Sequence, residues 1–69
     1  MQEVLFLIEE APEGGYLARA VGGESIITEA EDLEHLHEAI RDAVRCHFDE
    51  AHAPRLIRLH FTRDEVIAA

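Results

Sequence analysis

Residues 32–50 read DLEHLHEAIRDAVRCHFDE, and the other segments are best understood from the helix that this stretch predicts. At about 100° per residue, its apolar side chains fall within one stripe roughly 140° wide, and most of its charged side chains lie outside that stripe. The stripe holds Leu33, Leu36, Ile40, Ala43, Val44, His47 and Phe48. A helix with one apolar face needs an apolar surface to pack against, so the remaining segments are expected to form a sheet.

The helix has two possible starts. Asp32 directly precedes the first apolar residue of the stripe and is a favourable N-cap, whereas residues 28–31, TEAE, match the capping-box pattern. We predict Asp32 as the N-cap, because the apolar stripe begins after it. We expect the helix to end near Asp49 or Glu50, before Pro54, which cannot continue a helix.

Four other segments predict strands, at residues 3–9, 16–21, 24–28 and 55–63. The first contains five consecutive apolar residues, which indicates a central strand with both faces covered. The last alternates apolar and polar residues, which indicates one core face and one polar face. The dipeptide Gly22-Gly23 predicts a tight hairpin between the second and third strands.

The order strand–strand–strand–helix–strand predicts an α+β fold in a single domain, residues 1–69. Because strand–helix–strand crossovers are right-handed and the first strand should be internal, we expect a mixed four-stranded sheet of order 3-2-1-4, with the helix packed on one face. The opposite face would expose apolar side chains, and such a patch marks an interface. We therefore predict a homodimer or tetramer that uses this face or an edge strand. The candidate interface residues are Leu5, Leu7, Leu56, Arg58 and His60.

The charge balance constrains the partners. The chain has 15 acidic residues against six arginines and no lysine, a net charge of −9. Such a surface repels phosphate backbones, so direct nucleic-acid binding is not expected. A basic protein is the natural partner, and simple solubility is the alternative. Arg55, Arg58 and Arg63 form a basic strip on the last strand, for which three readings stay open: contact with an acidic patch on a second subunit, contact with RNA, or a solvated face.

Length and cysteine content narrow the class of protein. A chain of 69 residues buries only about 60% of its unfolded surface, which favours association with a partner. Cys46 is the single cysteine, so no disulfide within the chain supports the fold. A lone cysteine and the lack of a long apolar run predict a cytoplasmic protein with no membrane segment.

No set of residues has the spacing of a catalytic, metal or cofactor site, so we predict a non-enzymatic protein without a cofactor. His35 and His37 lie about 200° apart on the helix and cannot bind one metal ion together. Cys46 has no patterned base beside it, which favours a thiol without a catalytic role. His37, His47 and His60 raise the hypothesis that assembly depends on pH.

Several local motifs resemble the HicB-like antitoxins, in particular their N-terminal domain. The first strand leads into a turn at residues 14–16, GGY, and residues 28–36, TEAEDLEHL, align with the family signature Thr-x-Gly-x-Thr-x-Glu-Glu-Ala. Thr28, Asp32 and Glu34 match that signature in type, whereas Ala30, His35 and Leu36 depart from it. The missing glycine at Ala30 implies that this turn does not need a positive φ.

The resemblance covers roughly residues 3–63, and it implies a partial ribonuclease-H-like fold without that enzyme's chemistry. It also implies a function: binding a small basic RNA-cleaving toxin of HicA type and occluding its active surface. Full-length members carry a C-terminal DNA-binding domain, which is not expected in this chain. The alternative is a stand-alone homo-oligomeric structural domain with no toxin partner.

Overall fold

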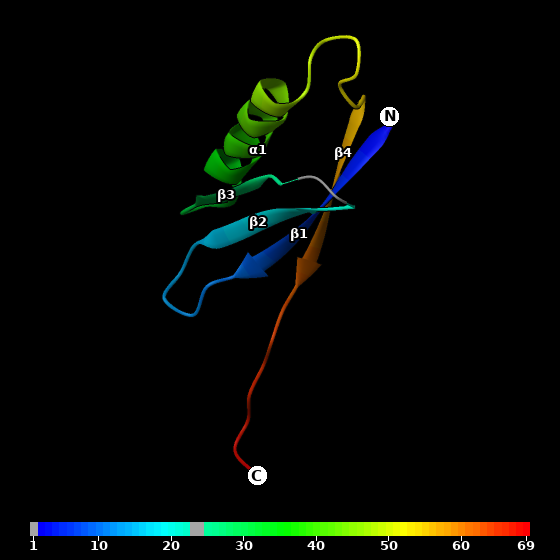
Figure 1. Ribbon diagram of the computed structural model, residues 1–69. Helices are drawn as coiled ribbons and strands as arrows, with labels where there is room; N and C mark the ends of the chain where they lie inside the picture. The colour runs from blue at the N-terminus through cyan, green and yellow to red at the C-terminus, as the bar shows by residue number, and fades with distance from the viewer. Residues whose placement is uncertain (1, 23–24) are drawn as a thin grey trace.

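The computed structural model describes residues 2–22 and 25–69, which form a four-stranded sheet with one helix on one face (Figure 1). The elements are β1 (Glu3–Glu10), β2 (Tyr16–Val21), β3 (Ile27–Ala30), α1 (Leu33–His47) and β4 (Leu56–Thr62). The strand order is β3-β2-β1-β4; β1 runs antiparallel to β2 and parallel to β4. The predicted α+β fold and its strand order are confirmed.

The core lies between α1 and the face of the sheet that it covers. Alternate residues of β1 point into it, and Phe6 at its centre sits opposite Ala20 of β2 and Leu59 of β4. Ala18 and Ala20 of β2 are small and buried in this core. The buried core consists of Val4, Phe6, Ile8, Ala18, Ala20, Ile26, Leu36, Ile40 and Val44. The centre of the predicted helix stripe is thus buried, whereas Leu33 and His47 at its ends are exposed.

The start of α1 agrees with the prediction. Asp32 has an extended backbone, and its Oδ1 accepts a hydrogen bond from the backbone N–H of His35 at 2.8 Å. The ring Nδ1 of His35 lies 2.8 Å from both carboxylate oxygens of Asp32. The side chain at the third helical position therefore reinforces the N-cap, in place of the glutamate of a capping box.

The end of α1 falls earlier than predicted. The helix stops at His47, and the backbone N–H of Phe48 makes the last bond, to the carbonyl oxygen of Val44. Asp49 does not continue the helix, because its Oδ1 accepts the backbone N–H of His52 at 2.9 Å. This local bond stabilises a turn and offers the backbone an alternative to the next helical turn.

The third strand was also misplaced. β3 begins at Ile27, not at residue 24, and Gly23 and Glu24 lie outside the described residues. The backbone N–H of Ala20 donates to the carbonyl oxygen of Ile26, and Arg19 pairs with Ile27, so the described pairing of β2 with β3 starts farther along the chain than predicted. The predicted antiparallel pairing of the second and third strands is confirmed, and the tight turn predicted at Gly22-Gly23 lies partly outside the described residues. Ile26 is buried in the core, whereas Ile27 faces away from the helix. This alternation sets the register of β3, which therefore begins later in the chain than predicted.

Gly15 occupies a backbone position that is unfavourable for any other residue. Its φ is +94°, and a Cβ there would lie 3.2 Å from the carbonyl oxygen of Ala30 on β3. Gly14 also has a positive φ, but a Cβ there would meet nothing within 4 Å. We expect Gly15→Ala to lower the free energy of unfolding by about 2 kcal/mol and Gly14→Ala by about 1 kcal/mol. Urea unfolding of both variants measures the difference, and equal losses would contradict the close approach to Ala30.

Candidate interaction surfaces

The sheet face opposite α1 carries all five predicted interface residues. In the sheet register Glu3 is opposite Leu56, Leu5 is opposite Arg58 and Leu7 is opposite His60, so these side chains share one face. Leu17, Val21 and Ile27 also lie on it, and Ile27 is 67% exposed. Sequence reasoning missed these three, although the alternation along the second and third strands could have identified them. We call this the open face; the interface role of its residues stays a prediction.

The open face shows that β1 is central but not covered on both sides. Leu5 and Leu7 are half-buried, because neighbouring side chains of the sheet shield them. No second layer covers the open face within residues 2–22 and 25–69. The described chain thus covers one face of the first strand with α1 and leaves the other bare, as expected from the sequence, and cover of the open face by a partner stays a prediction.

Arg58 makes a bidentate ion pair within its own chain. Its Nε donates to Oε2 of Glu3 at 2.9 Å and its Nη2 donates to Oε1 at 3.0 Å, across the β1–β4 pair. The guanidinium lowers the pKa of Glu3 through these hydrogen bonds, and the carboxylate in turn raises the pKa of Arg58. One of the three readings of the basic strip was contact with an acidic patch on a second subunit. For Arg58, such a contact would have to compete with the ion pair to Glu3.

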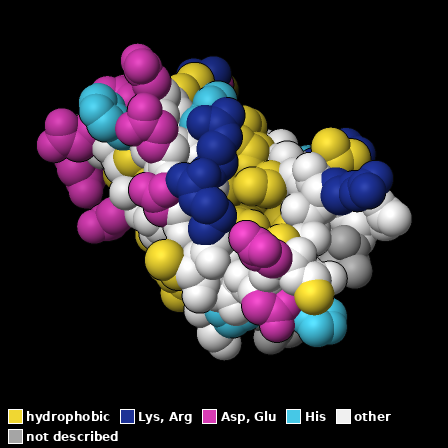
Figure 2. Space-filling view, turned by 90° about the horizontal axis from the view of Figure 1, so that it is seen from above, with side chains coloured by type: hydrophobic (Ala, Val, Ile, Leu, Met, Phe, Trp, Pro, Cys, Tyr) yellow, Lys and Arg dark blue, Asp and Glu magenta, His cyan; other side chains and the backbone are white. Residues whose placement is uncertain are grey.

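Carboxylates from three separate segments converge at one end of the molecule. The β1–β2 turn supplies Glu13, and the end of β3 and the residue after it supply Glu29 and Glu31, which line one hollow. Asp32 and Glu34 follow at the start of α1, and all five are exposed. No lysine or arginine occurs between residues 19 and 41 of the sequence. Figure 2 shows acidic side chains gathered at this side of the molecule. We call these five carboxylates the acidic end.

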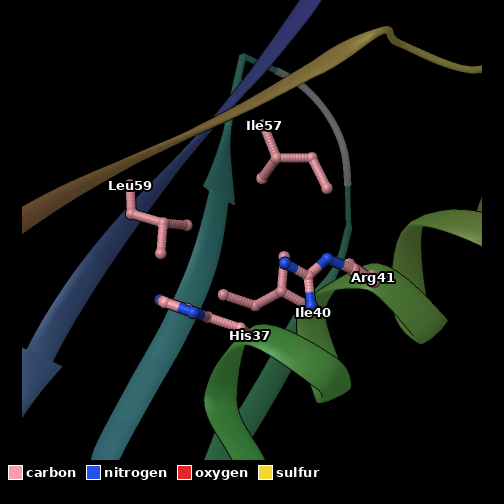
Figure 3. A pocket seen from close by; sticks show the side chains of 5 residues that line it. All are labelled: His37, Ile40, Arg41, Ile57 and Leu59. Carbon is pink, nitrogen blue, oxygen red and sulfur yellow. The ribbon is translucent and has the colours of Figure 1, made fainter. Parts of the chain in front are cut away.

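A groove separates α1 from β4 and has a volume of about 190 Å³. Ile40, Ile57 and Leu59 form its apolar floor, and His37 and Arg41 of α1 flank it (Figure 3). The same hollow shows apolar side chains beside basic ones in Figure 2. The groove exists because α1 packs over β2 and β3 and leaves the helix-facing side of β4 only partly covered.

Among the described residues, no group of three or more His, Cys, Asp or Glu side chains could hold a metal ion. The thiol of Cys46 is exposed and not in a disulfide. No helix in the described part of the chain is long and apolar enough to cross a membrane.

The Asp32–His35 pair makes the start of α1 sensitive to pH. Hydrogen bonds from the backbone and ring of His35 lower the pKa of Asp32 below its ordinary value of 3.8. The carboxylate raises the pKa of His35 above its ordinary value of 6.5. The stability that ionised Asp32 adds to the folded chain is therefore fully present above pH 3.8, and it is lost as the pH falls through the lowered pKa. The stability that protonated His35 adds to the folded chain is fully present below pH 6.5, and it is lost as the pH rises through the raised pKa.

We expect Asp32→Ala to lower the melting temperature by about 5 °C, because α1 loses its N-cap. His35→Ala should lower the melting temperature by less than Asp32→Ala does. Its effect should be larger near pH 5.5, where the His35 ring is charged, than at about pH 8.5. Thermal unfolding followed by circular dichroism measures both. The assigned pair would be contradicted by a His35→Ala effect of the same size at the two pH values.

Comparison with known proteins places the chain among a set of relatives with a shared name. It is 53% identical over 53 residues to a UPF0150 protein of Archaeoglobus fulgidus, covering 77% of each chain. It is 40% identical over 67 residues to a UPF0150 protein of Thermotoga maritima, covering 97% of this chain and 93% of the relative. No protein-family model matches, and no solved structure does. Identity at this level over nearly the whole length establishes that the chain belongs to the UPF0150 family.

Proposed function

We propose that this chain is a non-enzymatic, antitoxin-like interaction domain that binds a small basic RNA-cleaving toxin of HicA type. The observation that carries the proposal is the acidic end, where carboxylates from three segments gather in a part of the chain that has no lysine or arginine between residues 19 and 41. A protein that cleaves RNA binds phosphates through a basic surface. The acidic end is complementary to such a surface, and the HicB-like motifs supply the kind of toxin.

The mechanism is occlusion rather than chemistry. Exposed carboxylates attract the basic toxin over distance and raise its association rate. Once bound, Glu13, Glu29 and Glu31 occupy the positions of RNA phosphates on the toxin, so its active surface is covered. In the described part of the chain these three carboxylates make no ion pair with the chain's own arginines, so they are available for a partner.

A second candidate is a stand-alone homo-oligomeric domain with no toxin. The open face favours it, because Leu17, Val21, Ile27 and Leu56 are exposed there beside the half-buried Leu5 and Leu7. Exposed apolar surface of this kind marks an interface.

The test is a tagged pull-down from native lysate, with the mass of every bound species determined. A stoichiometric basic protein whose RNA cleavage stops when the chain is added supports the antitoxin proposal. Recovery of this chain alone, as a discrete oligomer, favours the second candidate. Metal-dependent RNA cleavage by the purified chain, abolished in Glu9→Gln, would overturn both non-enzymatic readings.

A further inference from the structure

The outer edge of β4 carries backbone groups available to another strand. The N–H of Leu56 donates to the carbonyl oxygen of Gln2 at 3.0 Å, so Leu56 directs its backbone groups toward β1. Alternate residues of a strand direct their N–H and C=O groups to the same side. Ile57, Leu59 and Phe61 therefore direct theirs away from β1, and no described strand pairs with them.

The side chains of the same three residues lie at an incompletely covered edge of the core. They stand opposite Val4, Phe6 and Ile8 of β1, on the helix side of the sheet. Ile57 and Leu59 line the groove beside α1, and Phe61 remains 50% exposed. One strand edge thus combines free hydrogen-bonding groups with unburied apolar side chains, which is the usual template for pairing with another chain.

We propose that the occupant of this edge is the β4 strand of a second copy, paired antiparallel about a two-fold axis at Leu59. In this register Leu59 faces the partner subunit's Leu59, and Ile57 faces the partner subunit's Phe61. All three outward-facing residues then exchange backbone hydrogen bonds with their partners. The result is a continuous eight-stranded sheet with both helices on the same face.

Neighbouring registers are disfavoured by the sequence of β4. Moving the axis to Arg58 places two guanidinium groups opposite each other, and like charges in that position are destabilising. Moving it to His60 places Ile57 opposite the partner subunit's Arg63. The axis at Leu59 is the register in which every outward-facing residue of β4 meets an apolar partner. Pairing would end beyond Phe61, where Arg63 would meet the partner subunit's Arg55.

This dimer covers the groove side of β4 and leaves the acidic end and the open face free. It therefore does not depend on the proposed toxin binding, since the acidic end lies at the β1–β2 turn and the start of α1. It also selects the edge strand from the two interfaces that the sequence predicted.

Self-association is tested first by analytical ultracentrifugation of the whole chain. We expect a species of twice the 7.8 kDa chain mass. Leu59→Lys places two lysines at the axis and should weaken dimerisation by roughly 100-fold. The matched control is Ile27→Lys on β3, the opposite edge strand, which should still dimerise. A wild-type monomer at high concentration, or a dimer that Ile27→Lys breaks and Leu59→Lys does not, would overturn the proposal.

A cross-linking test fixes the register and does not depend on how well Leu59→Lys folds. In a Cys46→Ser background, Leu59→Cys should form a covalent dimer on mild oxidation, because residues facing each other across antiparallel strands have Cβ atoms about 5 Å apart. Leu56→Cys is more exposed but should not cross-link, since the two copies of residue 56 would lie six residues apart along the paired strands, about 20 Å. Cross-linking at position 56 and not at position 59 would refute the assigned axis.

Discussion

Phe6→Ala should cost about 3–5 kcal/mol of unfolding free energy and leave much of the chain unfolded at room temperature. The Phe6 side chain is completely buried at the centre of β1, between Ala20 on one side and Leu59 on the other. Its removal leaves a cavity that the flanking strands cannot fill. A chain of 69 residues has a total stability of about 3–10 kcal/mol, so a loss of this size is comparable with the whole.

Leu7→Ala is the matched control, since Leu7 is the next residue on the same strand and points to the open face. Leu7 is only half-buried, so we expect a loss of about 1 kcal/mol. Urea unfolding followed by circular dichroism compares the two variants. A Leu7→Ala loss as large as that of Phe6→Ala would mean that the open face is covered, against the arrangement described above.

Sequence patterns predicted those parts of the fold that depend on local periodicity. The five apolar residues of β1 predicted an internal strand, and the position of Asp32 before the apolar stripe predicted the helix start. Both predictions are confirmed, because the burial of a strand and the capping of a helix depend on residues that are close together in the sequence. The end of α1 was predicted too late, because the Asp49 side chain accepts a hydrogen bond from the backbone N–H of His52 and stabilises a turn there. The pattern of apolar residues does not reveal this bond.

The surfaces were harder to predict, because they depend on register. Glu3 and Arg58 are separated by 55 positions in the chain, and only the parallel β1–β4 pairing brings them together. Glu13 joins Glu29 and Glu31 only because β2 pairs with both β1 and β3. The sequence shows an excess of acidic residues, but it does not show where they gather.

The placement of these charges leads to the second large effect, which concerns the association rate with the proposed basic toxin. We expect the triple variant Glu13→Gln, Glu29→Gln and Glu31→Gln to slow association by roughly 10-fold to 100-fold at low salt. Long-range attraction acts mainly on the rate of encounter, so dissociation should change less. Stopped-flow or surface-plasmon measurements separate the two rates.

The control variant changes the net charge by the same amount at positions outside the acidic end. It combines Glu50→Gln, Asp64→Asn and Glu65→Gln, and all three of these side chains are exposed. At about 0.1 M salt the screening length is about 10 Å, so only carboxylates close to the approaching toxin still attract it. The acidic-end variant should then retain a clear defect, while the control variant should associate like the wild type. Equal slowing by both triples at that salt would show that net charge, and not the acidic end, attracts the partner. The proposed site would then be wrong even if the toxin itself is real.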